Sequence, residues 1–290
     1  MSGARSEPLL VMIHHNRPDL TRLALASLIA HTPRPYELLL IDNASPDRLE
    51  GLGADTLVRN PAPRSFAANC NQGLARAAGR PVVLLNNDLF LPPGWLAGLT
   101  AGLMAGWGVV GAVSNYELPL DLPAPDGGRL RLDAQAEPVA VGGRWGFLAG
   151  LLGRSNAGAL QRPPQARPFV SFYAAALAPA AVAALGPLCE EYEQGCEDLD
   201  WCLMAWARGF RVGQASGAYV VHFSGRATNA DPQTLMRRDA RNLPALFGRW
   251  PRPARAELAR AWEAAGIGGQ GAELWARLAR RRDWLQKRAA

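Results

Sequence analysis

The fold of this chain is decided by one stretch, PVVLLNND, which occupies residues 81–88. Its apolar part runs without interruption and then gives way to two asparagines and an aspartate, Asp88. A short apolar run between Gly79 and the proline pair at 92–93 is typical of a strand buried on both faces. Ligands of open α/β sheets bind beyond the carboxyl ends of such strands. Asp88 is therefore expected where a metal-bound diphosphate could be held, although a polar turn that merely closes a core strand would fit the same letters.

Strands and helices alternate around this stretch. Apolar runs predict strands at residues 9–13, 36–41, 56–58, 82–86 and 109–113, and helices are expected at residues 18–30 and 65–78 and after residue 92. This alternation with short links is typical of an α/β fold, a Rossmann-like and mostly parallel sheet flanked by helices. The dinucleotide fingerprint Gly-x-Gly-x-x-Gly is missing after the first run, where His14 and Asn16 stand instead. Its absence argues against a dinucleotide-dependent oxidoreductase.

We expect two parts in the chain, residues 1–230 and residues 231–290. Within the first part, residues 115–168 lose the alternation and are expected to form an irregular insert. Order should return in an aromatic-rich strand, Phe169 to Leu177. The second part is expected to be two or three helices and is basic. From Arg237 onward there are 13 Lys and Arg against 5 Asp and Glu, a net +8, so the whole-chain charge of +6 leaves −2 for the rest.

The composition of the chain favours some cellular locations over others. The chain has no run of about eighteen apolar residues, and it does not begin with the basic-then-apolar layout of a secretory signal. Its four cysteines lack the paired spacing of a zinc site and favour reduced thiols in a cytoplasmic protein. In the basic part, Leu274, Leu278 and Leu285 form an apolar stripe among arginines. Such a helix could lie on the anionic inner face of the cell membrane, but packing on the rest of the chain or on a second subunit is commoner and is favoured.

A second informative stretch is EDLDWCLMAWARG at residues 197–209. Apolar residues at i, i+3, i+4 and i+7 from Leu199 predict a helix that Gly209 closes. Its first turn carries three acids, Glu197, Asp198 and Asp200, where the helix dipole favours negative charge. Ordinary helix-start chemistry explains these acids as well as a function does. The functional interpretation is that one of them is an ionised general base that accepts a hydroxyl proton.

A lone histidine, His222, follows the β-branched run at residues 219–221. Neutral imidazole is a common metal ligand, but a histidine in such a run is more often a packed core residue. Both interpretations stay open on residue type alone.

Six motifs occur in one order along the chain: NRP at 16–18, DNAS at 42–45, N-x-G at 71–73, NND at 86–88, EDLD at 197–200 and the histidine at 222. At predicted strand ends and helix starts, in this order, they resemble the inverting family 2 glycosyltransferases of the GT-A fold. The resemblance spans Leu9 to Ser224 and is poor in the insert at 115–168. It implies a GT-A domain over residues 1–230, with the insert on the acceptor side and the basic helices as an extension.

The resemblance also implies roles for individual residues. Those that would hold the nucleotide are His14, Asn16, Asp42, Asn43, Asn71, Asn86 and Asn87. Asp88 would bind a metal ion and His222 would complete the metal site, while Asn86 stands where an aspartate is usual and so removes a charge. Asp198 would be the general base. The acceptor side would include Glu197, Asp200, Trp201 and Tyr173.

The implied activity is the inverting transfer of a hexosyl, deoxyhexosyl or N-acetylhexosaminyl group. The donor would be a UDP-, dTDP- or GDP-linked sugar, and the acceptor a hydroxyl of a glycan, polysaccharide or lipid-linked saccharide, as in polysaccharide biosynthesis. Mg²⁺ or Mn²⁺ would stabilise the leaving diphosphate while Asp198 takes the acceptor proton, and this single displacement inverts the anomeric carbon. No nucleic acid partner is expected, and peripheral membrane contact and a homodimer stay open.

Two alternatives compete with this interpretation. A nucleotidyltransferase that makes sugar nucleotides shares the same strand-and-acid logic, but it would need a glycine-rich loop with a basic residue after the first strand, and HHNRP at 14–18 is a poor substitute. The second alternative is a degenerate module that binds nucleotide sugars without catalysis. Its best support is Asn86, which replaces the usual aspartate. The intact carboxylates of Asp88 and Asp198 argue against it.

Overall fold

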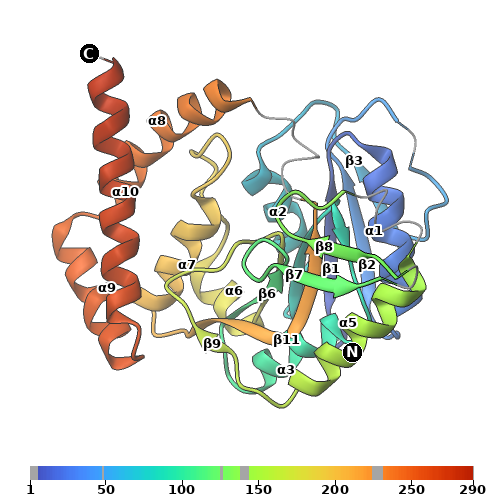
Figure 1. Ribbon diagram of the computed structural model, residues 1–290. Coiled ribbons are helices and arrows are strands. Elements are labelled where there is room, and N and C mark those ends of the chain that lie inside the picture. The colour runs from blue at the N-terminus through green and yellow to red at the C-terminus, as the bar shows by residue number, and fades with distance from the viewer. Residues whose placement is uncertain (1–5, 48, 125–126, 138–143, 224–230, 290) are drawn as a thin grey trace, which may run out of the picture.

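The computed structural model (Figure 1) describes residues 6–47, 49–124, 127–137, 144–223 and 231–289. Its centre is a sheet of nine strands among these residues, in the order β3-β2-β1-β4-β10-β6-β11-β5, with β9 paired to β11. The strands are β1 (Leu9–His14), β2 (Glu37–Asp42), β3 (Thr56–Arg59), β4 (Val82–Asn86), β5 (Leu89–Phe90), β6 (Val109–Ser114), β9 (Gln165–Ala166), β10 (Ala174–Leu177) and β11 (Val212–His222). The predicted strands before residue 115 are thus confirmed to within one or two residues.

The sheet is mixed, and one reversed strand decides where the site lies. The strands β1, β2, β3 and β4 run parallel, and β6 runs parallel to β11, but β10 runs antiparallel between β4 and β6. The beginning of β10 therefore lies beside the carboxyl end of β4, with Ala174 opposite Leu85. Just beyond this pair, the Asn86 N–H donates to the Tyr173 carbonyl at 2.8 Å. The predicted strand from Phe169 is shorter than expected, and residues 169–173 lead into it.

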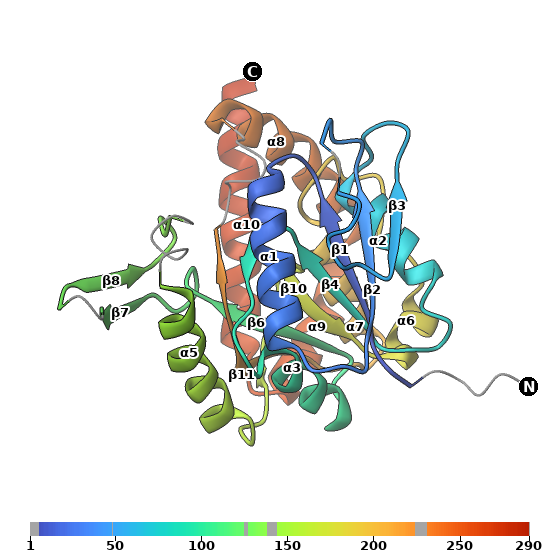
Figure 2. The same ribbon diagram turned by 90° about the vertical axis from the view of Figure 1, so that its right-hand side faces the viewer.

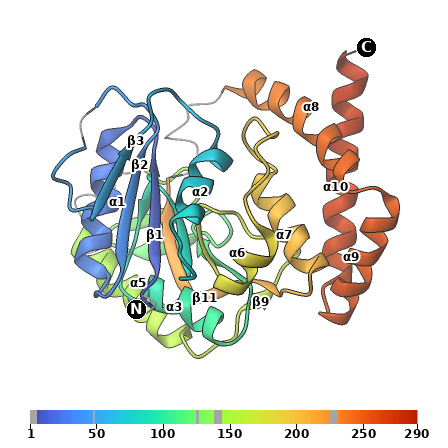
Figure 3. The same ribbon diagram turned by 180° about the vertical axis from the view of Figure 1, so that it is seen from behind.

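Helices cover both faces of the sheet (Figures 2 and 3). They are α1 (Pro18–His31), α2 (Phe66–Ala75), α3 (Trp95–Met104), α5 (Trp145–Ala159), α6 (Pro179–Leu185) and α7 (Glu197–Ala207). Strand residues alternate between two apolar clusters: Leu9 and Val11 pack with residues of α2 and α7, whereas Leu10 and Met12 pack with residues of α1 and α3. Because the strands are buried from both sides, they needed the unbroken apolar runs that made them predictable.

The insert at 115–168 is not irregular throughout, which corrects the expectation. A hairpin of β7 (Leu120–Pro123) and β8 (Arg129–Leu132) is followed by the 15-residue helix α5. Glycines hid this helix, since glycine weakens helical propensity. At Gly153 the glycine has a packing reason, because a Cβ there would lie 3.0 Å from the Cβ of Pro93. Residues 125–126 and 138–143 of the insert lie outside the described residues.

The basic tail forms three helices, α8 (Pro232–Arg249), α9 (Arg252–Ala264) and α10 (Gly268–Ala289), beside α7 in Figure 1. Leu274 and Leu285 of the predicted stripe are buried in the same apolar cluster as α7 residues. The boundary expected at residue 230 falls in 224–230, outside the described residues. The packing favoured from the sequence is therefore the one observed for these two leucines.

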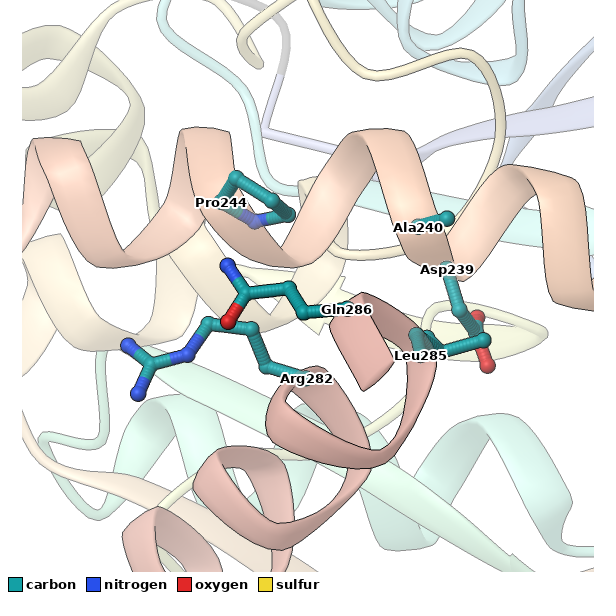
Figure 4. Close-up of a pocket in the computed structure, with 6 residues that line it drawn as sticks. All are labelled: Asp239, Ala240, Pro244, Arg282, Leu285 and Gln286. Carbon is teal, nitrogen blue, oxygen red and sulfur yellow. The ribbon is translucent and has the colours of Figure 1, made fainter. Parts of the chain in front are cut away.

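A small pocket opens between α8 and α10 (Figure 4). Its lining residues are Asp239, Ala240, Pro244, Arg282, Leu285 and Gln286. All six belong to the tail helices, so this pocket is separate from the carboxyl ends of the strands. Within the described part of the chain, none of the helices combines the length and the apolar character that crossing a membrane requires.

Candidate active site

The first polar group of the site lies where β1 and β4 end side by side. The buried His14 ring has its Nδ1 2.6 Å from Oγ1 of Thr21. The amide of Asn87 donates to the same hydroxyl at 2.8 Å and to the Asn16 carbonyl at 3.2 Å. Burial lowers the pKa of His14, so its ring is neutral at pH 7. Three residues expected near the nucleotide are therefore brought together, and Thr21 joins them although no sequence motif marked it.

The next group lies at the end of β2. Asp42 accepts the Ser45 N–H at 2.9 Å and lies 3.1 Å from Nη1 of Arg59. Asn43 accepts from the Arg64 N–H at 2.8 Å and from the Asn60 amide at 3.0 Å, while its own NH₂ group donates to the Arg64 carbonyl at 2.9 Å. The Asn43 side chain is fully engaged in shaping the loop after β3. We therefore assign it a supporting role rather than the direct nucleotide contact expected for it.

Asn71 makes its hydrogen bonds to the segment before α7, and its place near the nucleotide stays a prediction. Its oxygen accepts the Leu188 N–H at 2.8 Å, and its NH₂ group donates to the Leu188 carbonyl at 3.0 Å and to Glu190 at 2.8 Å. These bonds join α2 to the segment that leads into α7. The residue thus holds two parts of the fold in register.

Asp88 and His222, far apart in sequence, face each other. β5 follows Asp88 and pairs antiparallel with β11, with His222 opposite Leu89, and the Phe223 N–H donates to the Asp88 carbonyl at 2.9 Å. This pairing sets Oδ1 of Asp88 3.2 Å from Nε2 of His222. Oδ1 is buried and makes no hydrogen bond of good geometry. A buried carboxylate oxygen without a donor is costly unless a ligand completes it.

A divalent cation fits this pair of atoms. Two neighbouring ligands of an octahedral Mg²⁺, each about 2.1 Å from the ion, lie about 3.0 Å apart. The separation of Asp88 Oδ1 and His222 Nε2 is close to this value. Among the described residues no group of three or more His, Cys, Asp or Glu side chains is gathered for a metal ion. The remaining ligand positions would therefore be filled from donor phosphates and water.

The first turn of α7 holds the other acidic group. Oδ1 of Asp198 accepts the Leu199 N–H at 2.7 Å, and the Phe172 N–H also donates to this carboxylate. Burial nevertheless raises the pKa of Asp198 above its ordinary value. Desolvation thus outweighs the N–H groups in setting the direction of this shift. The role of Asp198 as an ionised general base stays a prediction.

Glu197 lies beside it and is 4% exposed. Its Oε2 is buried without a hydrogen-bond partner. Burial, and next the nearby charge of Asp198, raise the pKa of Glu197 to about 7. Glu197 is therefore part of the buried interior, and its contact with an acceptor stays a prediction.

Phe172 and Tyr173 connect the two acidic groups, because each of them contacts one group. The Tyr173 ring stacks on the His222 ring with centroids 4.6 Å apart and planes at 26°. Its carbonyl accepts the Asn86 N–H, and the neighbouring Phe172 N–H donates to Asp198. The Asp88–His222 pair therefore contacts Tyr173, and Asp198 contacts the preceding residue, Phe172. Two neighbouring residues of the chain thus link the two acidic groups near the carboxyl end of β4.

Three further residues expected to meet an acceptor are buried instead. Asp200 is fully buried and accepts from the Trp250 indole at 2.6 Å and from Arg249 at 3.0 Å, which ties α7 to α8. Trp201 is fully buried, and its indole donates to the Gly186 carbonyl at 3.1 Å. Tyr173, 6% exposed, lies under His222. Asp200 and Trp201 lie on α7 as the helical spacing predicted, whereas Tyr173 lies just before β10. A contact of these three residues with an acceptor stays a prediction.

Sequence reasoning missed Glu117, in the turn after β6. Its carboxylate accepts from the Ser114 N–H at 3.0 Å and from the Tyr173 hydroxyl at 3.1 Å. It thereby supports the ring on which His222 stacks. Glu117 stands in the stretch whose pattern dissolves, so no sequence signal marked it.

Comparison with known proteins agrees with this architecture. The family model for Glycosyl transferase family 2 matches residues 9–135. Among solved structures, GalNAc-T7 with UDP, GalNAc and Mn²⁺ is similar with a TM-score of 0.55 and 15% identity, over 92% of this chain and 56% of that one. The mannosyltransferase PcManGT from Pyrobaculum calidifontis, in complex with GDP-Man and Mn²⁺, is similar with a TM-score of 0.56 and 18% identity. The match covers 99% of this chain and 85% of that one. No curated protein matches.

The expected fold class is confirmed by these comparisons. The family resemblance is confirmed over residues 9–135, which hold the first four of the six motifs. The chain spans little more than half the length of GalNAc-T7, so the likeness to that protein is one of fold.

Proposed function

We propose that this chain, whose residues 9–135 match glycosyl transferase family 2 and which has the GT-A fold, transfers a sugar from a nucleotide diphosphate to an acceptor hydroxyl. One observation carries the proposal. The Asp88–His222 pair contacts Tyr173 and the Asp198 carboxylate accepts the N–H of the preceding residue, Phe172, near the carboxyl end of β4, where ligands of α/β folds bind.

The residues divide the chemistry between them. Asp88 and His222 would hold Mg²⁺ or Mn²⁺, which when bound stabilises the negative charge that develops on the departing diphosphate. Asp198 accepts the proton of the attacking hydroxyl. A raised pKa suits this role, because a stronger base removes a hydroxyl proton more readily. A single displacement with one base and no carboxylate nucleophile inverts the anomeric carbon.

The donor side is proposed to use the polar group at the ends of β1, β2 and β4. His14, Asn16 and Asp42 would face the nucleobase and ribose, and Asn86 and Asn87 the diphosphate, while Asn43 and Asn71 hold the surrounding loops. The two similar structures contain UDP with GalNAc and GDP-Man. We accordingly propose a UDP-, dTDP- or GDP-linked hexose, deoxyhexose or N-acetylhexosamine as the donor, and a glycan or lipid-linked saccharide as the acceptor.

Titration of UDP, GDP and dTDP sugars, with and without Mn²⁺, tests the proposal by thermal protection of the protein. We expect one nucleoside diphosphate sugar to protect in a Mn²⁺-dependent manner. Asp88→Ala should abolish the Mn²⁺ dependence, and the control Asp239→Asn on α8 should retain it. A requirement for a nucleoside triphosphate would instead indicate a nucleotidyltransferase. Protection without slow hydrolysis or transfer of the sugar would indicate a binding module.

For the tail, residues 231–290, we propose a packing role on the GT-A domain. Leu274 and Leu285 are buried in the apolar cluster that also holds α7 residues, and Trp284 is 39% exposed. If the tail contacts an anionic membrane surface at the inner face of the cell membrane, its exposed arginines would make the contact. The buried leucines of the apolar stripe would not insert into the membrane. Co-sedimentation with anionic vesicles at low and physiological salt tests this, and sedimentation velocity tests a homodimer.

A further inference from the structure

Asn115, directly after β6, holds the backbone of His222 with both ends of its amide. The His222 N–H donates to Oδ1 of Asn115 at 2.6 Å, and Nδ2 of Asn115 donates to the His222 carbonyl at 3.2 Å. Asn115 is fully buried. The side-chain amide thus makes the two hydrogen bonds that a neighbouring strand would otherwise make to His222. It lies on one side of β11, and Leu89 of β5 lies on the other.

The same NH₂ group has a second acceptor. Nδ2 of Asn115 lies 2.6 Å from the carbonyl of Asp133, which directly follows β8. One buried amide therefore joins the hairpin of β7 and β8 to the residue that faces Asp88. Because the Asn115 amide bonds both segments, a displacement of the hairpin base would also displace the His222 backbone. The hairpin belongs to the insert.

A second asparagine makes the same arrangement three residues earlier on β11. Oδ1 of Asn156 accepts the Tyr219 N–H at 2.8 Å, and its Nδ2 donates to the Tyr219 carbonyl at 3.2 Å and to the Pro93 carbonyl at 3.1 Å. Asn156 is also buried, 1% exposed. The two amides are alike in partners and burial, but only Asn115 holds a residue that faces the cation site.

We infer that Asn115 is a positioning residue for the metal site: it sets His222 opposite Asp88 and links that setting to the hairpin of the insert. The inference rests on the proposed function. Groups that orient a metal ligand, when removed, cost about 10–100-fold in metal affinity. Without Asn115 the His222 ring keeps its stacking on Tyr173 but loses the bonds that fix its backbone. The imidazole then occupies several positions, of which one suits the cation.

The test compares Asn115→Ala with Asn156→Ala. Mn²⁺ binding is measured directly from the electron paramagnetic resonance signal of the free ion, in the presence of UDP or GDP. We expect similar losses of thermal stability in both variants, since each removes the side-chain partner of three backbone groups. Only Asn115→Ala should weaken Mn²⁺ binding, by about 10–100-fold. Equal effects of both variants on Mn²⁺ affinity, or none in either, would overturn the inference.

A second measurement separates this inference from the proposed function. The imidazole resonances of His222, recorded by nuclear magnetic resonance without any metal, should shift in Asn115→Ala and stay in place in Asn156→Ala. If the unsubstituted protein binds no Mn²⁺, the proposed function fails, but these resonances still decide whether Asn115 positions His222. Unchanged resonances in Asn115→Ala would refute it. Asn115→Ser, which leaves a smaller cavity, replaces the alanine variant if that variant does not fold.

Discussion

Two buried polar regions of the molecule differ in how well their atoms are partnered. In the first, the amides of Asn43, Asn60, Asn69 and Gln72 bond to one another beyond the ends of β2 and β3, with donor–acceptor distances between 2.7 and 3.4 Å. In the second, the start of α7, Glu197 keeps a buried oxygen without a partner, and burial raises the pKa of both Glu197 and Asp198. One region is saturated with hydrogen bonds and the other is not.

The difference separates support from chemistry. A buried amide network in which each group has a partner is rigid and resists rearrangement. Carboxyl groups whose pKa values are raised by burial lower the stability of the folded protein at neutral pH. Such groups are found mainly at functional sites, where their chemistry is needed. We therefore expect substitutions in the amide network to change stability without changing the pH dependence of the protein. Substitutions of the acids at the start of α7 should change the pH dependence of stability or of activity.

The largest effect is expected from Asp198→Asn. The amide cannot accept a proton, so kcat should fall by roughly 10²–10⁴-fold, the usual contribution of a general base. In the unsubstituted protein, kcat should rise with pH as Asp198 loses its proton, and the raised pKa moves this rise above the range of an exposed aspartate. Transfer assays across pH, with donor binding measured separately, check both statements.

Donor affinity provides the control for Asp198→Asn, because it should stay within about twofold of the parent. Near-normal turnover in this variant would remove Asp198 from the mechanism. Asp239→Asn, a substitution in the tail helix α8, should leave kcat and its pH dependence unchanged.

Glu197→Gln should change how stability depends on pH. A carboxyl whose pKa is raised from 4.5 to about 7 on folding stabilises the native state fully below pH 4.5 and loses that contribution as pH rises through 7. Glutamine never ionises, so the variant should gain stability relative to the parent over this window, by up to about 3 kcal/mol. Urea unfolding at several pH values between 4.5 and 8 measures the difference. A constant difference across that range would show that Glu197 ionises normally in the folded protein.

Asn60→Ala tests the saturated region. Asn60 donates to Asn43 and Asn69 and accepts from Gln72, so its removal breaks three hydrogen bonds. The oxygens of Asn43 and Asn69 are then left with one donor each, the Arg64 N–H and the Gln72 amide. We expect a loss of about 2 kcal/mol in the free energy of unfolding. This loss should be the same at pH 5 and pH 8, and kcat should be unchanged. A loss that varies with pH would show that the amide network is coupled to ionisable groups after all.

Most of the sheet could be predicted from sequence because its strands are buried on both faces. The run expected at residues 9–13 is found as β1, and the helix expected at 18–30 is found as α1 over 18–31. The direction of β10 could not be predicted, since Ala174–Leu177 carries no local signal of which neighbours it joins. The helix α5 was missed because its glycines weaken the helical signal, and one of them, Gly153, serves a contact with Pro93 that is made only in the folded protein.

The site was predictable where its residues stand in ordered motifs at strand ends. Asp88 and His222 were expected together and are 3.2 Å apart. Burial was not predictable: Asp200 and Trp201 lie on α7 as expected, but their partners on α8 and at Gly186 are distant in sequence. Asn115 was invisible for the same reason, because its partner His222 stands 107 residues away.

The smallest effect is expected from Arg59→Gln, at the solvent edge of the first region. Arg59 lies 3.1 Å from Asp42, but its side chain is 46% exposed, so the ion pair should contribute less than about 1 kcal/mol to stability. Asp42 is 1% exposed and is proposed to face the ribose, so freeing its carboxylate should raise the donor KM a few-fold while kcat stays the same. Urea unfolding and donor titration measure the two quantities. A stability loss as large as that of Asn60→Ala would extend the rigid network to the surface, whereas an unchanged KM would separate Asp42 from the nucleotide.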